Sequence, residues 1–104
     1  MKISTWRIKE MYGYEPKTTF YEDFSIADMF GVSAIKDTYK RAFKGWKDNV
    51  VYITELCMVL NWKSWEHQND RLCDTYCDLF YTLQDWCREN LKGDDLQYFY
   101  ETTD

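Results

Sequence analysis

Apolar residues recur at intervals of three and four along much of this chain, and that spacing is typical of α-helices rather than strands. Between residues 33 and 47 the spaced residues are Ile35, Tyr39, Ala42, Phe43 and Trp46. Between residues 70 and 92 they are Leu72, Tyr76, Leu79, Leu83 and Trp86. Side chains spaced in this way share one face of a helix, so each stretch is expected to bury one side and expose the other.

Residues that favour helix starts and ends divide the remainder of the chain. The expected starts are, in order, Ser4 or Thr5, Ser25, Ser33, Asp48 or Asn49, Asp70 and Asp94. Gly13, Gly31 and Gly93 lie where helices are expected to end. The first element is ambiguous, because residues 2–9 also alternate as a strand would. The segment that follows Asn49 is apolar on nearly all sides, which indicates a helix at the centre of a domain.

The length and composition favour a single helical domain. With 104 residues the chain has room for one core, and four glycines with one proline are too few for an all-β fold with many turns. Five Trp, nine Tyr and six Phe give that core a large buried area. We expect one all-α domain, residues 1–104, forming a compact bundle of five or six helices. Residues 1–17 can form an arm against a helical core of residues 18–104.

No segment for export or membrane insertion is expected from the sequence. No uncharged run exceeds seven residues, whereas about 20 apolar residues span a bilayer. The first residues also lack the apolar stretch of a signal peptide. We therefore expect a cytoplasmic protein whose cysteines stay reduced and pack as small apolar residues. These are Cys57, Cys73, Cys77 and Cys87.

Charge is distributed unevenly along the chain, whose net charge is -5. Residues 1–63 contain ten basic and eight acidic residues, whereas residues 64–104 contain three basic and ten acidic residues. Such asymmetry bears on partners and association rates rather than on the fold.

One acidic series lies on the helix expected from residue 70. Its members are Asp70, Asp74, Asp78, Asp85 and Glu89. At about 100° per residue they fall within roughly a third of the helix circumference, opposite the apolar stripe. Two interpretations stay open. The series is either the solvated side of an ordinary amphipathic helix or a surface for a basic partner, such as a nucleic-acid-binding protein or another copy of the chain.

Residues 25–33 resemble the helix-turn-helix motif, since Ala27 and Gly31 have its four-residue spacing. The resemblance implies that the next helix contacts DNA phosphates through its basic residues. Those residues are Lys36, Lys40, Arg41, Lys44 and Lys47. Asp37 and Lys40 depart from the motif, because apolar residues occupy their positions in the family. The alternative is an ordinary helix pair with a solvated basic face.

The sequence contains no signature of an enzyme. It has no glycine-rich phosphate loop, no nucleophile elbow and no paired histidines for a metal. Cys73 and Cys77 lie one helical turn apart, with the single histidine, His67, upstream. Structural zinc sites take ligands from more than one element, so this spacing alone does not make one. We expect no catalytic residue, no metal site and no cofactor.

Several aromatic residues are candidate anchors for a partner, because Trp and Tyr dominate binding hot spots. They are Trp62, Trp65, Tyr81, Tyr98 and Tyr100. The alternative is that they belong to the core. A core of this size leaves some of the twenty rings partly exposed in either case.

From Thr18 onward the chain resembles a family of small acidic helical proteins carried on conjugative elements and phages of gut bacteria. The resembling segments are Thr19–Phe20, Asp23–Asp28, Asp37–Phe43, Thr54–Leu56, Val59–Lys63 and Asn90–Gly93. The family has no known activity, so the resemblance implies a setting rather than a mechanism. Small acidic proteins in that setting often resemble anti-defence factors, which occupy the nucleic-acid groove of a CRISPR effector or restriction enzyme.

The leading hypothesis is a non-enzymatic anti-defence inhibitor that binds a basic protein surface through the acidic helix face. The alternatives are a helix-turn-helix DNA-binding regulator and a structural or oligomerisation module, with a homodimer as one form. No membrane partner is expected.

Overall fold

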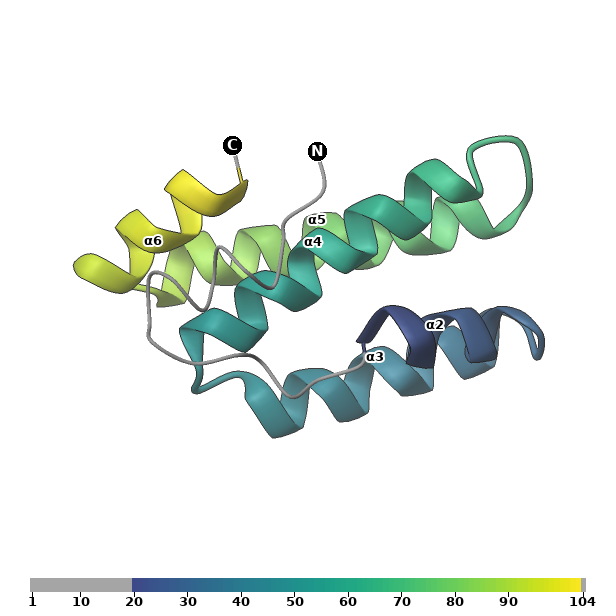
Figure 1. Ribbon diagram of the computed structural model, residues 1–104, viewed down its shortest axis with the longest axis horizontal. Helices are drawn as coiled ribbons and strands as arrows, with labels where there is room; N and C mark the ends of the chain where they lie inside the picture. Colours follow the sequence, from purple (N-terminus) through teal and green to yellow (C-terminus); the bar gives the residue numbers. More distant parts are fainter. Residues whose placement is uncertain (1–19, 104) are drawn as a thin grey trace.

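Five helices and no strand make up residues 20–103, the part of the chain that the computed structural model describes (Figure 1). The helices are α2 (Phe20–Asp28), α3 (Val32–Trp46), α4 (Val50–Glu66), α5 (Leu72–Asn90) and α6 (Asp94–Thr103). The expected all-α bundle is therefore confirmed over this range. The helix expected from Ser4 or Thr5 to Gly13, and the arm at residues 1–17, lie outside the described residues.

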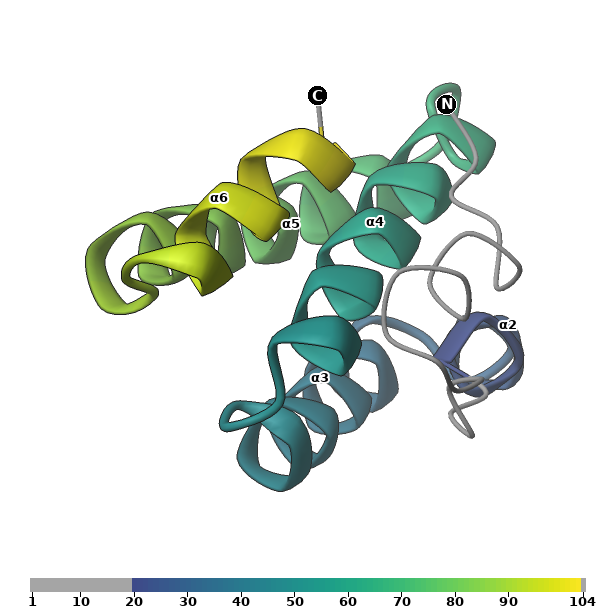
Figure 2. The same ribbon diagram turned by 60° about the vertical axis from the view of Figure 1, so that its left-hand side comes forward.

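Helix α4 lies at the centre and packs against each of the other four helices. The hairpin of α2 and α3 covers one side of it, while α6 lies on the other (Figures 1 and 2). Residues 51–54 and 56–60 are all buried, so α4 is covered on every side. This arrangement confirms the central helix that its apolar sequence predicts.

None of the helices between residues 20 and 103 has both the length and the apolar run that crossing a bilayer requires.

The amphipathic helices α3 and α5 turn their apolar stripes toward α4. Ile35 of α3 and Leu83 of α5 are fully buried. Phe43 and Trp86 pack edge to face, with ring centroids 4.9 Å apart, and so join α3 to α5. The three-and-four spacing therefore predicts correctly which face of each helix is hidden.

Two expected caps are found close to their predicted positions. Oδ1 of Asn49 accepts hydrogen bonds from the backbone amides of Val51 and Tyr52, at 3.1 and 3.3 Å, and so caps α4. Oδ1 of Asp70 accepts a hydrogen bond from the Leu72 amide at 2.8 Å, at the start of α5. Both satisfy amides that have no partner within the helix.

The expected starts of α2 and α3 are wrong. Helix α2 begins at Phe20 instead of Ser25, because Phe20 and Phe24 are buried and hold the earlier turn against the core. Ser25 lies inside the helix, where its hydroxyl donates to the Tyr21 carbonyl at 2.8 Å. Helix α3 is capped by Gly31, whose φ of 105° suits glycine, and not by the exposed Ser33.

Candidate functional site

The exposed side of α5 carries four carboxylates, which together form the acidic face. They are Asp74, Asp78, Asp85 and Glu89. Leu72 and Leu83, on the opposite side of the helix, are buried. Among residues 20–103, none of the four carboxylates makes an ion pair with a lysine or an arginine. Their charges therefore project into solvent together.

Asp70, the fifth predicted member, has a different environment. Its Oδ2 lies 2.9 Å from Nδ1 of His67, while its Oδ1 accepts the Leu72 amide. The hydrogen bond with His67, followed by the one from the Leu72 amide, lowers the pKa of Asp70. Asp70 therefore fixes the turn between α4 and α5, and it is not part of the acidic face.

A groove of about 170 Å³ between α4 and α5, the aromatic groove, borders the acidic face. Its lining residues are Asn61, Ser64, Trp65, Gln68, Cys73, Cys77, Phe80 and Tyr81. Trp65 is 65% exposed and Tyr81 is 59% exposed. Tyr81 follows Asp78 by three residues and Asp74 by seven, so the three side chains emerge on one side of α5. The structure thus brings two predicted aromatic anchors next to the predicted acidic residues.

The other three predicted anchors are not at this groove. Tyr98 is 3% exposed and belongs to the core, as the alternative interpretation expects. Trp62 is half-buried against the core. Tyr100 is 42% exposed but lies on α6. Trp65 and Tyr81 therefore remain as the anchors beside the acidic face.

The five basic residues predicted to contact DNA are all exposed on α3 and at its end. They are Lys36, Lys40, Arg41, Lys44 and Lys47, and within residues 20–103 none of them takes part in an ion pair. Helix α3 folds back along α2 as a hairpin (Figure 1), whereas the two helices of a helix-turn-helix meet at about 90–120°. DNA binding remains a prediction that rests on the exposed basic side chains.

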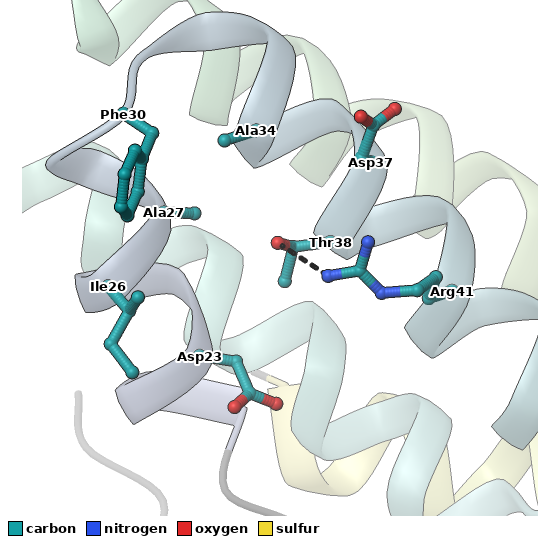
Figure 3. A pocket seen from close by; sticks show the side chains of 8 residues that line it. All are labelled: Asp23, Ile26, Ala27, Phe30, Ala34, Asp37, Thr38 and Arg41. Atoms are coloured by element: carbon teal, nitrogen blue, oxygen red, sulfur yellow. Dashed lines mark hydrogen bonds between the residues drawn. The ribbon is translucent and has the colours of Figure 1, made fainter.

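A second groove, of about 480 Å³, lies between α2 and α3 (Figure 3). The patterns within single helices do not predict it. Its lining residues are Asp23, Ile26, Ala27, Phe30, Ala34, Asp37, Thr38 and Arg41. Ile26 and Phe30 are 58% and 76% exposed, and the neighbouring Met29 is 80% exposed. Ile26 and Phe30 lie four residues apart, on a different side of the helix from the buried Phe24 and Ala27. That spacing is a sequence signal for a second apolar face at the end of α2.

A largely buried group of charged and polar residues, the Asp28 cluster, connects α2 to α4 and α5. Its members are Asp28, Lys63, His67 and Tyr76. Oδ2 of Asp28 lies 2.6 Å from Nζ of Lys63 and 2.8 Å from Nε2 of His67. The Tyr76 hydroxyl donates to Oδ1 of the same carboxylate. Lys63 is only 2% exposed, and its role was not predicted from the sequence, where it only interrupts an otherwise apolar helix.

Hydrogen bonds and burial shift the pKa values of Asp28, His67 and Tyr76. Burial alone would raise the pKa of Asp28, but hydrogen bonds from Lys63, Tyr76 and His67 outweigh it and lower that pKa. Burial would lower the pKa of His67, but its hydrogen bonds with Asp70 and Asp28 raise it. Burial, followed by the hydrogen bond to Asp28, raises the pKa of Tyr76. The cluster therefore favours an ionised Asp28 and a protonated His67.

These states argue against a nucleophile in this cluster. Nζ of Lys63 lies 3.2 Å from Oγ of Ser25 but closer, at 2.6 Å, to Oδ2 of Asp28. The Ser25 hydroxyl already donates its proton to the Tyr21 carbonyl. His67 has a carboxylate at each ring nitrogen. The arrangement supports a structural role, which is to hold α2 against the turn between α4 and α5.

The four cysteines divide into two environments. Cys57 and Cys87 are buried, and burial raises the pKa of both thiols, that of Cys87 to about 12. Cys73 and Cys77 are half-buried in the aromatic groove, with their sulfur atoms 3.8 Å apart. Over residues 20–103, no three His, Cys, Asp or Glu side chains converge as metal ligands would. His67 is directed to Asp28 and Asp70 instead of the thiols.

Comparisons with known proteins return no relative for this chain. No protein-family model matches it, and neither a characterised protein nor a solved structure is significantly similar to it.

Proposed function

We propose that this protein acts by binding, without catalysis, to a basic surface on another protein, through the acidic face and the adjoining aromatic groove. One observation carries the proposal. Four exposed carboxylates without ion pairs in the described part of the chain lie beside two exposed aromatic rings. Charge of this kind accelerates encounter with a partner of opposite sign, while a desolvated Trp or Tyr supplies much of the binding energy.

The partner class that fits best is a nucleic-acid-binding protein. Such proteins carry clefts rich in lysine and arginine that bind phosphates, and a row of carboxylates complements that pattern. Occupying the cleft would exclude the nucleic acid and inhibit the partner. The anti-defence inhibitor is the form of this function that the family resemblance favours.

Affinity capture with the tagged full chain tests the proposal. Wild-type protein is expected to capture a protein with a basic surface. The triple variant Asp74→Asn, Asp78→Asn, Asp85→Asn is expected to bind that partner at least tenfold more weakly at low salt. Its association rate should also depend less on salt, because fewer charges remain to steer the encounter.

A matched variant separates the acidic face from net charge. Asp48→Asn, Asp95→Asn, Glu101→Gln removes the same three charges from other exposed positions. It is expected to bind like the wild type. Equal behaviour of the two triple variants would contradict the proposal.

Trp65→Ala is expected to increase the dissociation rate at every salt concentration, because the indole ring contributes apolar contact rather than charge.

Nucleic-acid binding through α3 is a second candidate function. It is favoured by the exposed positions of Lys36, Lys40 and Lys44 on one side of a single helix. A labelled DNA duplex should then bind at about 50 mM salt and dissociate by about 200 mM, because bound counterions are released on association. Lys36→Gln, Lys40→Gln, Lys44→Gln should reduce the salt dependence. Absence of binding at low salt would contradict this function.

A further inference from the structure

Three large apolar side chains protrude from the end of α2 and the turn that follows it. Ile26, Met29 and Phe30 are 58%, 80% and 76% exposed. They account for three of the seven large apolar residues that are exposed among residues 20–103, yet they lie within five consecutive positions. Clustered apolar exposure of this kind marks interaction sites more often than scattered exposure does.

The α2–α3 groove lies directly beside these residues. Small side chains form its floor: Ala27 is 4% exposed, Thr38 is 8% exposed, and Ala34 adds a methyl group (Figure 3). Asp23, Ile26 and Phe30 stand on the α2 side, while Asp37 and Arg41 stand on the α3 side. One surface of the molecule therefore holds both a protruding apolar group and a hollow with room for such a group.

We propose that this surface pairs with the same surface of a second copy of the chain. In a two-fold arrangement each copy contributes both the protrusion and the hollow, so one patch satisfies both sides of the interface. Phe30 of each copy enters the groove of the other copy, and Arg41 of each copy meets Asp37 of the other.

The charges around the groove favour a second copy over a strongly charged partner. Asp37 and Arg41 place opposite charges on the same rim. A partner of one sign would meet repulsion at one of them, whereas a two-fold copy presents the opposite charge at both. The Arg41 guanidinium has a single hydrogen bond among the described residues, to the Thr38 hydroxyl at 3.4 Å, which leaves donors for a carboxylate.

The position of the groove also limits repulsion between copies. The chain has a net charge of -5, and most of the imbalance lies after residue 63. The groove is built from α2 and α3, and α3 carries exposed basic residues. Pairing through this groove therefore brings α2 and α3 of the two copies together and uses no residue of the acidic face on α5. A dimer would present two acidic faces, but the pairing itself does not depend on the function proposed above.

Sedimentation equilibrium of the purified full chain, over a range from nanomolar to about 100 μM, tests the proposal. Wild-type protein is expected to associate to a dimer. Phe30→Ser is expected to raise the dimer dissociation constant at least tenfold, because it removes the group that enters the groove. Tyr100→Ser provides the matched control, since Tyr100 is also exposed but lies on α6, and it should leave association unchanged.

Exchanging the charges of Asp37 and Arg41 tests the proposed contact between these two residues of different copies, which Phe30→Ser does not test. Arg41→Glu and Asp37→Arg should each weaken association, and the double variant should restore it, because the rim again carries one charge of each sign. Both positions are exposed, so thermal unfolding should show folded protein in every case. A wild-type chain that stays monomeric throughout the range would overturn the proposal. So would a dimer that neither Phe30→Ser nor the single charge changes affect.

Discussion

Asp28 and the acidic face both carry carboxylates, but these differ in exposure and in ion pairing. Asp28 is 14% exposed at its side chain and contacts Lys63, His67 and Tyr76. The four carboxylates of the acidic face are exposed, and no ion pair reaches them from the described residues. A buried charge must be matched within the fold, whereas an exposed one is stabilised by water and stays available to a partner. Mutations in the Asp28 cluster should therefore lower the stability of the fold, whereas mutations in the acidic face should leave it nearly unchanged.

Replacing Lys63 with methionine should have the largest effect. The substitution keeps the long apolar stem but removes the charge that pairs with Asp28 and, at 3.5 Å, with Glu66. A largely buried carboxylate without its cation costs about 3 kcal/mol, the low end of the range for buried pairs. Urea unfolding should show a loss of that order in the free energy of unfolding. Lys36→Met, at an exposed position of α3, is the control and should change it by less than about 0.5 kcal/mol. Equal effects of the two substitutions would contradict the assigned roles.

Removing the Tyr76 hydroxyl should have an intermediate effect. The hydroxyl donates to Asp28 and also lies 3.3 Å from the Phe24 carbonyl oxygen. Tyr76→Phe leaves the ring in the core but leaves a buried carboxylate with one donor fewer, which should cost about 1–3 kcal/mol. The exposed Tyr81→Phe should be nearly neutral for stability. A stable Tyr76→Phe variant would show that the remaining members satisfy Asp28 by themselves.

The pH dependence of stability should reveal His67. Its pKa is raised in the folded state, so its contribution is complete below the unfolded value of about 6.5 and is lost as pH rises through the folded value. The groups around it are the carboxylates of Asp28 and Asp70, together with Lys63 and the Tyr76 ring. The stability difference between wild type and His67→Gln should therefore be largest below about pH 6.5 and shrink as the pH rises above it. A stability difference that grows as the pH rises would contradict the raised pKa of His67.

The Asp28 cluster should also contribute less stability in acid, because the pKa of its carboxylate is shifted in the opposite direction from that of His67. The pKa of Asp28 is lowered, so its contribution is present above the unfolded value of about 3.9 and is lost as pH falls through the folded value.

Neutralising the acidic face should have the smallest effect on stability. Asp74→Asn, Asp78→Asn, Asp85→Asn removes no ion pair with another described residue. It also relieves repulsion between carboxylates one turn apart, which amounts to a few tenths of a kcal/mol per pair. The free energy of unfolding should stay within about 0.5 kcal/mol of the wild-type value. A large loss would mean that these residues serve the fold rather than a partner.

Periodicity predicted most of the fold because helices are local structures. The stripe from Ile35 to Trp46 and the stripe from Leu72 to Trp86 required only the order of residues along each helix. The start of α2 was predicted wrongly. Ser25 resembles a cap in the sequence, but burial of Phe20 and Phe24 extends the helix beyond it. Propensity at one position is weaker than the burial of two aromatic rings.

The candidate site was predictable only in part, for the same reason. The positions of Asp74, Asp78 and Asp85 on one side of α5 follow from helical geometry. Their position beside Trp65 does not follow from it, because Trp65 belongs to α4 and the groove forms where the two helices pack.

The amino-acid order by itself determined the helical class, the central place of α4, and the separation of basic and acidic faces onto α3 and α5. These features depend on residues within a few turns of one another. Only the tertiary structure decided that Asp28 meets His67, 39 residues away, and Tyr76, 48 residues away. It also decided that Phe30 protrudes beside a groove floored by alanines. Such contacts arise from packing between separate helices, which no repeat within one helix encodes.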